Sequence, residues 1–287
     1  MSRRALLVAV GLVAVAFPAF AYEIKPKTPD TAFPGKLQPD IVGMSSEVDA
    51  DKARAVYESY LKDLPGVKPQ AVQQKFGSTN VTYVTAMTFD KPATADHAGE
   101  SMTSAFSSPA SGNVAYYVLR GLGFGKTSQP SKTEMIAHVT DKYGKPTVIG
   151  DGHIYYFYRK GKTVSVKQKY TPASALDALN APVNPKAAVA LNDANGRGSC
   201  IAALKHVEAA SDKSLAGLVA EAKSANCDGL LSVALLPGVT ADRVSKATFT
   251  LIDFKRIASA AKIDDAAFAA EKSEAQNRAP AGSAPKL

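Results

Sequence analysis

The amino-terminal segment determines the compartment in which the rest of this chain would fold. A short basic start precedes an uncharged apolar run over residues 5–17, and Ala19 and Ala21 form an A-x-A pattern. This order of basic, apolar and small residues is typical of a cleaved secretory signal peptide. The run is shorter than the roughly 20 apolar residues that a membrane-spanning helix requires. We therefore predict a signal peptide over residues 1–21, a periplasmic or secreted protein, and no transmembrane segment.

The two cysteines, Cys200 and Cys227, agree with export. In an oxidising compartment a single pair of cysteines most simply forms a disulfide. The chain-entropy model gives an unstrained loop of this size about 3.5 kcal/mol of stabilisation. A redox-active pair is the alternative, but the C-x-x-C spacing that tunes a thiol is absent. The sequence predicts a structural disulfide.

The charge of the chain narrows the class of partner. The formal net charge is +8 at pH 7, and the lysines are scattered rather than gathered in runs. A basic exported protein meets envelope proteins, anionic lipids and cell-wall polymers before it meets nucleic acid. We expect a partner from one of these three classes and no nucleic acid.

The stretch RGLGFGKTSQP, residues 120–130, is similar to a phosphate-binding loop but departs from its pattern. A Walker A loop requires a glycine where this chain has Arg120. Ser131 and Glu134 have the spacing of a capping box, which would start the next helix several residues after the Lys-Thr pair. The first helical amides would then not face a phosphate. We expect neither a nucleotide nor another cofactor.

Hydrophobic periodicity and turn residues predict helices mixed with antiparallel strands. The predicted helices cover residues 53–64, 131–143, 211–224 and 255–271. The predicted strands cover residues 70–76, 80–89, 102–106, 113–122, 147–149, 153–159, 163–169, 230–236 and 247–254. Because the elements do not alternate strictly as β-α-β, the predicted class is α+β, with one or more antiparallel sheets and helices packed on one face.

Shifts in composition divide the chain into segments. They are a signal peptide (1–21), an extended lead-in (22–45), an α+β domain (46–170), a linker or long loop (171–197), a smaller disulfide-stapled α+β unit (198–271) and a disordered tail (272–287). The two α+β segments form either one domain or two small subdomains.

The aromatic run over residues 155–158 is the strongest candidate for a binding surface. Alternate side chains of a strand face opposite sides, so one pair of these rings would pack into the core. The other pair, Tyr156 and Tyr158, would be exposed beside cations that include Lys160 and Lys162. An aromatic strip with a cationic rim suits a sugar polymer, a lipid headgroup or a protein. The alternative is that a helix covers this second face.

Motifs for catalysis are absent from the sequence. Neither G-x-S-x-G nor H-E-x-x-H occurs. The pairs Asp151 with His153 and His97 with Glu100 have metal-ligand residue types, but loops explain both pairs better. We predict no catalytic, cofactor-binding or metal-binding residues.

Three short motifs resemble the SmpA/OmlA type of small bacterial envelope lipoprotein. They are Gly-Met-Ser at 43–45 before a helix, Tyr-Gly-Lys-Pro at 143–146 after a helix, and the aromatic strand at 155–158. The resemblance implies a protein-binding module of the cell envelope.

These observations favour an exported, non-enzymatic binding module of the cell envelope. The alternative is a periplasmic hydrolase or another cell-wall enzyme whose active site is assembled from dispersed residues.

Overall fold

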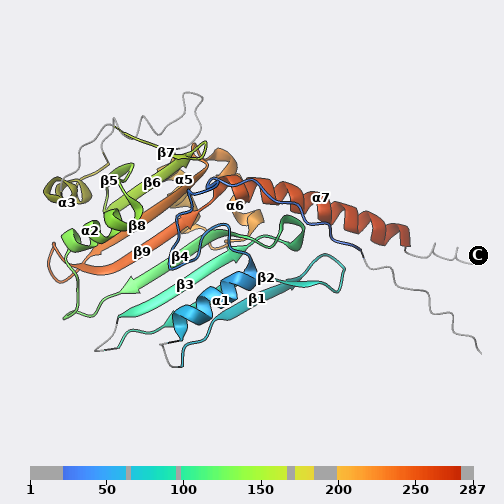
Figure 1. Cartoon of the computed structure of the whole chain (residues 1–287), viewed down its shortest axis with the longest axis horizontal. Helices are drawn as coiled ribbons and strands as arrows, with labels where there is room; N and C mark the ends of the chain where they lie inside the picture. The colour runs from blue at the N-terminus through green and yellow to red at the C-terminus, as the bar shows by residue number, and fades with distance from the viewer. Residues whose placement is uncertain (1–21, 63–65, 95–97, 167–171, 184–198, 279–287) are drawn as a thin grey trace, which may run out of the picture.

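A computed structural model describes residues 22–62, 66–94, 98–166, 172–183 and 199–278 (Figure 1). The predicted signal peptide and most of the predicted linker lie outside the described residues. The described part contains one antiparallel sheet with helices on both of its faces, which confirms the α+β class.

The sheet has nine described strands in the order β1-β2-β3-β4-β9-β8-β6-β5, with β7 also paired to β6. Their bounds are β1 Gln70–Lys75, β2 Thr82–Lys91, β3 Gly99–Phe106, β4 Ala115–Gly123, β5 Val148–Gly150, β6 His153–Arg159, β7 Lys162–Thr163, β8 Gly229–Pro237 and β9 Val244–Ile252. The strands β8 and β9 from the cysteine-containing segment lie between β4 and β6 of the preceding segment. The segments 46–170 and 198–271 therefore share one sheet, and the division into two subdomains is wrong.

Helices cover both faces of this sheet instead of one. The described helices are α1 Ala50–Leu61, the short 3-10 helix η1 Pro109–Ser111, α2 Lys132–Tyr143, α3 Pro172–Asn180, α5 Cys200–Ala209, α6 Leu215–Ser224 and α7 Phe254–Arg278. The helices α1, α2 and α3 pack into one core cluster, together with the lead-in residues Phe33 and Met44. The helices α5, α6 and α7 pack into a second cluster on the opposite face. The central strands are therefore apolar on both sides, as expected for a sheet between two helical layers.

Two segments contain more helix than the composition predicts. The helix α3 lies inside the predicted linker, where its Leu179 is fully buried. The helix α7 continues to Arg278, so residues 272–278 are helical and are not part of a disordered tail. Figure 1 shows this end of α7 extending beyond the sheet. In both cases the alanine-rich composition suits a helix as well as a loop.

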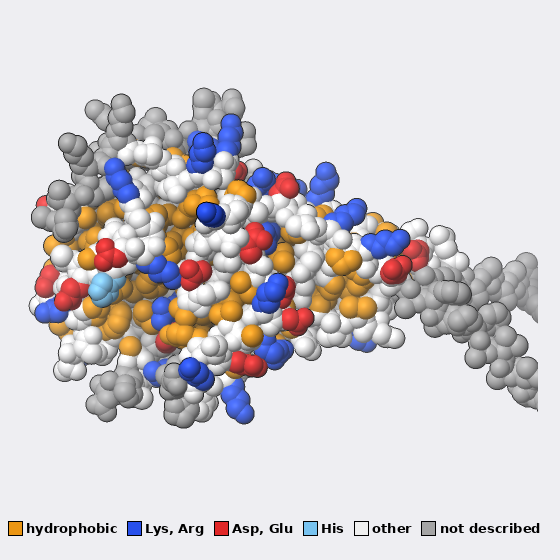
Figure 2. Space-filling model, in the orientation of Figure 1, with side chains coloured by type: hydrophobic (Ala, Val, Ile, Leu, Met, Phe, Trp, Pro, Cys, Tyr) orange, Lys and Arg blue, Asp and Glu red, His pale blue; other side chains and the backbone are white. Residues whose placement is uncertain are grey.

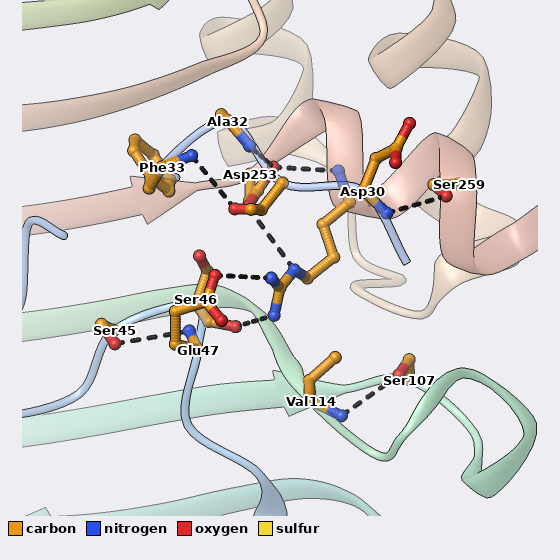
Figure 3. Close-up of polar contacts among 12 residues, drawn as sticks. Asp30, Ala32, Phe33, Ser45, Ser46, Glu47, Ser107, Val114, Asp253 and Ser259 are labelled. Atoms are coloured by element: carbon orange, nitrogen blue, oxygen red, sulfur yellow. Dashed lines mark hydrogen bonds and ion pairs between the residues drawn. The ribbon is translucent and has the colours of Figure 1, made fainter. Parts of the chain in front are cut away.

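The lead-in and the two residues that follow it are joined to the start of α7 by a buried polar network (Figure 3). The Asp253 carboxylate accepts hydrogen bonds from the Ala32 amide at 3.0 Å and from the Thr31 hydroxyl at 2.6 Å. Arg256, which is 2% exposed, donates to the Ser46 carbonyl and to the Glu47 carboxylate, the latter at 2.8 Å. A buried charge requires such partners. The lead-in is thus an integral part of the fold.

The face that carries α1 and α2 shows interspersed charges in Figure 2. Lys and Arg side chains alternate with Asp and Glu, and apolar side chains are visible between the two helices. Every helix within the described ranges is too short or too polar to serve as a membrane-spanning segment.

Candidate functional site

The aromatic run on β6 is buried, which corrects the expectation of an exposed strip. Tyr156 is 0% exposed and Tyr158 is 3% exposed. The ring of Tyr156 packs at 5.9 Å from Tyr143 of α2, and the ring of Tyr158 packs edge-on at 5.0 Å from Phe33 of the lead-in. On the other face, Phe157 packs into the cluster formed with α5. Because β6 is an inner strand between two helical layers, neither aromatic pair reaches solvent.

The cations expected to rim this strip are separated from it. Lys160 and Lys162 are exposed at the turn and at the start of β7. The Lys160 amide donates a hydrogen bond to the Asp228 carboxylate, and its φ of 50° fits the tight turn before Gly161. The two lysines lie in a solvent-exposed turn, whereas Tyr156 and Tyr158 are buried. The four residues therefore do not form one partner surface.

The predicted disulfide joins Cys200 and Cys227, whose Cα atoms are 5.8 Å apart. It links the first residue of α5 to the segment that enters β8. Both cysteines are buried in the second core cluster. This environment is that of a structural crosslink and is compatible with an oxidising compartment.

The glycine-rich stretch connects β4 to α2. The capping box is confirmed, since Ser131 and Glu134 satisfy each other's backbone amides. The helix α2 begins at Lys132, five positions after Thr127, so its amino terminus does not follow the Lys-Thr pair directly. The first amides of α2 are thus separated from the Lys-Thr pair, whereas in a phosphate-binding loop the helix begins at that pair.

His153 and Glu100, one member of each pair with metal-ligand residue types, make contacts within the protein. His153 Nδ1 contacts the Asp151 carbonyl at 2.7 Å, and its ring stacks on Tyr155. Glu100 lies on β3 and binds Arg120, while His97 lies outside the described residues. Over the ranges that the structure describes, His, Cys, Asp and Glu form no group of three or more that could hold a metal ion.

A cleft of about 640 Å³ opens on the sheet face that carries α6 and α7, and we call it the α6–α7 cleft. Its floor consists of residues of the first four strands. They are Gln74, Tyr83, Thr85, Ala86, Thr103, Ala105, Phe106 and Tyr116, together with the adjacent Ser108. Its walls are formed by the loop before α6, the start of α6 and the middle of α7. They are Asp212, Lys213, Ser214, Leu215, Ala216 and Val219 on one side, and Ala261, Asp264, Asp265 and Phe268 on the other.

The helix α7 spans the cleft because both its middle and its far end are anchored. Asp264 accepts hydrogen bonds from the hydroxyls of Ser108 at 2.8 Å and Ser111 at 2.6 Å. Further along, the ring of Phe268 stacks at 4.4 Å on Phe76, beside the turn that joins β1 to β2. The residues that α7 presents to the cleft recur at helical spacing, which places them on one face of the helix. The α7 side of the cleft is therefore held by packing within the fold, while the loop before α6 contributes Asp212, Lys213 and Ser214.

The charged side chains that line the cleft are mainly acidic. Asp212, Asp264 and Asp265 contribute carboxylates, whereas Lys213 contributes the single ammonium among the described lining residues. This ammonium is engaged, because the Lys213 Nζ donates to carbonyl oxygens near the end of α5, those of Val207, Glu208 and Ala210. An acidic cleft in a basic chain is a local reversal of the overall charge.

Ionisable groups of the cleft are perturbed by burial. Desolvation raises the pKa of the Asp264 carboxyl, against the opposing effect of its hydrogen bonds from Ser111 and Ser108. Burial likewise raises the pKa of the Tyr83 and Tyr116 phenols. Perturbed groups that converge in a cleft are a property of functional sites.

A shallower hollow lies beside α1 on the opposite face, lined by Val42, Ala55, Val56, Ser59 and Tyr60. The Tyr60 hydroxyl donates to the Glu100 carboxylate at 2.7 Å, and Arg120 Nε binds the same carboxylate at 2.6 Å. Arg120 Nη2 in turn donates to the Tyr60 hydroxyl at 2.8 Å. This ion pair is electrically balanced and internally satisfied, so the α6–α7 cleft is the stronger candidate site.

Sequence reasoning missed the α6–α7 cleft. The spacing of Ala261, Asp264, Asp265 and Phe268 was readable as one helix face. The sheet residues opposite them, such as Ala86 and Thr103, are distant in sequence, and no local pattern indicates that they meet α7. Comparisons of the chain with protein-family models, with curated proteins and with solved structures gave no match. The class that the structure itself defines is a single-sheet α+β protein with a structural disulfide.

Proposed function

We propose that the chain is an exported, non-enzymatic binding module of the bacterial cell envelope, and that its partner or ligand occupies the α6–α7 cleft. The observation that carries the proposal is the cleft itself. Its volume of about 640 Å³ falls in the roughly 300–1,000 Å³ range of ligand pockets, and its lining combines apolar and aromatic residues with polar and charged ones. The predicted signal peptide and the buried disulfide support export.

The chemistry of the cleft ranks the expected partner classes. Its carboxylates repel phosphate, so an anionic lipid is the least suited occupant. A group from an envelope protein or from a cell-wall polymer fits better, provided that it is neutral or cationic. The proposed binding site is therefore on the face of the sheet opposite to Tyr156 and Tyr158. The expected partner is still a component of the cell envelope.

A cleft-filling substitution tests this role. Ala86 lies on the floor and is partly exposed, so Ala86→Trp would fill the cleft while leaving the core clusters intact. In a crosslinked capture from envelope fractions, we expect the wild-type chain to retain a component that Ala86→Trp loses. The control is Val239→Trp at the β8–β9 turn, where the side chain is 59% exposed and distant in the fold. Identical captured components for all three proteins would refute the proposed site.

A periplasmic hydrolase or another cell-wall enzyme is the second candidate. The observation that favours it is the raised pKa of Asp264 within the cleft, a property of acid–base groups. Against it, the Asp264 carboxylate is held by Ser108 and Ser111 as a structural anchor of α7. Release of soluble products from cell-wall fractions by the wild type, but not by a folded Asp264→Asn variant, would favour the enzyme.

A further inference from the structure

We propose that the ligand of the α6–α7 cleft is an organic ammonium ion, that is, a small amine or quaternary ammonium compound with apolar substituents. This inference rests on the proposed binding function and names the class of ligand. It combines three independent properties of the lining residues: their charge, their aromatic content and their apolar side chains.

The first property is unbalanced negative charge. Asp265 is exposed and makes no hydrogen bond among those of the described residues. The carboxylate of Asp212 accepts one hydrogen bond on each oxygen, both from Ser214, and so retains further acceptor capacity. The ammonium of Lys213, in the described lining, is directed to backbone carbonyls of α5. A cationic ligand would therefore supply the charge that the cleft lacks.

The second property is the concentration of aromatic rings. Tyr83, Tyr116 and Phe268 line the cleft with aromatic groups, whereas the ring of Phe106 packs into the core cluster on the other face of the sheet. The negative faces of aromatic rings attract cations, and rings grouped around a pocket are the usual means of recognising quaternary ammonium groups. An inorganic cation is less well suited, because it requires several oxygen ligands at short distance, and the described carboxylates do not form a group of three that could hold a metal ion.

The third property is the apolar wall of α6. Leu215 and Val219 face the cleft from one side, and Ala261 faces it from α7. These side chains can pack against the alkyl substituents of an ammonium ion, because moving alkyl groups from water to an apolar surface is favourable. A compact, strongly hydrated ammonium ion would gain little from them. The wall therefore selects an alkylated amine.

A titration with choline and with dimethylbutanol, its uncharged carbon isostere, tests the proposal. The two probes have nearly the same shape and differ in charge. Using amide chemical shifts of the full-length protein, we expect choline to perturb Ala86, Thr103 and Leu215 and to bind about tenfold more tightly than dimethylbutanol. Equal affinity for the two probes would show an apolar site without preference for charge and would overturn the proposal. Absence of choline binding at the cleft would overturn it as well.

Matched variants test the role of the carboxylates. Asp265→Asn removes one exposed charge of the cleft at constant shape, and we expect choline binding to weaken about two- to fivefold. Asp141→Asn removes another exposed charge, on α2 across the sheet, and should leave binding unchanged. Equal affinities of both variants and the wild type would contradict a contribution from Asp265.

Vesicles of phosphatidylcholine distinguish a lipid headgroup from a soluble amine, because they present the same ammonium group on a bilayer. Cleft shifts with free choline and no co-sedimentation with vesicles support a soluble ligand. Co-sedimentation that free choline inhibits supports a headgroup ligand. If choline fails while Ala86→Trp still abolishes envelope capture, the cleft binds another ligand class and only the ammonium proposal is lost.

Discussion

At the scale of single residues, Tyr156 shows how a polar aromatic side chain serves the core. It is completely buried, and its hydroxyl donates to the Gly144 carbonyl at 2.9 Å, directly after α2. Burial raises the pKa of this phenol because the phenolate would be desolvated. The side chain therefore joins α2 to β6 through packing and through one hydrogen bond.

The two functions of the Tyr156 side chain can be separated by substitution. We expect Tyr156→Phe to lower the free energy of unfolding by about 1 kcal/mol, because it removes only the hydrogen bond. Tyr156→Ala should lower it by about 3–5 kcal/mol, because it also leaves a cavity. Urea denaturation measures both values, with the exposed Lys162→Ala as a control expected within about 0.5 kcal/mol of the wild type. A stable Tyr156→Ala variant would restore the interpretation of Tyr156 as a surface residue.

The alternation of the aromatic run could be predicted from the sequence, but its burial could not. The period-two spacing predicts which rings lie on the same face of the strand, and Tyr156 and Tyr158 do lie in the same core cluster. Whether a face is covered depends on distant segments, in this case Phe33 of the lead-in and α2. A strand that is apolar on both faces indicates an inner strand between two layers.

At the scale of elements, capping, turn and periodicity patterns predicted the helices and strands whose patterns lie within one short stretch of sequence. The helix α2 follows from its capping box and from Gly144 at its end, and β6 follows from its aromatic run. The helix α3 was missed because proline, alanine and asparagine around it resemble a linker, although Leu179 anchors it in the core. The helix α5 was also missed as a helix, because its polar residues obscure the short apolar stripe that includes Ala203 and Val207.

The disulfide makes a testable contribution at this scale, since it fixes α5 against the entry to β8. We expect replacement of Cys200 and Cys227 by alanine to lower the free energy of unfolding by about 3.5 kcal/mol, mainly through the larger entropy of the unfolded chain. Urea denaturation of the variant and of the wild type, the latter with and without reductant, measures the loss. The reduced wild type should match the variant. A variant as stable as the oxidised wild type would show that the crosslink contributes nothing to folding.

At the scale of the whole molecule, the order of the strands in the sheet could not be predicted from the sequence. The strand β4 pairs with β9, and β6 pairs with β8, although the partners are far apart in the chain. The long segments between paired strands contain no sequence pattern that indicates which strands will pair. The apparent linker at 171–197 therefore suggested a domain boundary that the sheet does not have. The candidate cleft could not be predicted for the same reason, because α7 and the first four strands are far apart in the sequence.

The interleaved sheet predicts that the two α+β segments do not fold separately. A fragment of residues 22–170 would lose β8 and β9, which leaves the facing edges of β4 and β6 unpaired. It would also lose α5, α6 and α7, which uncovers Tyr155 and Phe157. Unpaired strand edges and exposed apolar faces cannot offset the conformational entropy of folding and favour aggregation. We expect this fragment to show no cooperative urea transition by circular dichroism, whereas residues 22–287 should show one. Adding the separately produced segment 171–287 should restore the transition, because β8 and β9 can then insert between β4 and β6. A cooperative transition of the fragment alone would instead mean that β4 and β6 pair without β8 and β9, which contradicts a sheet in which β8 and β9 separate them.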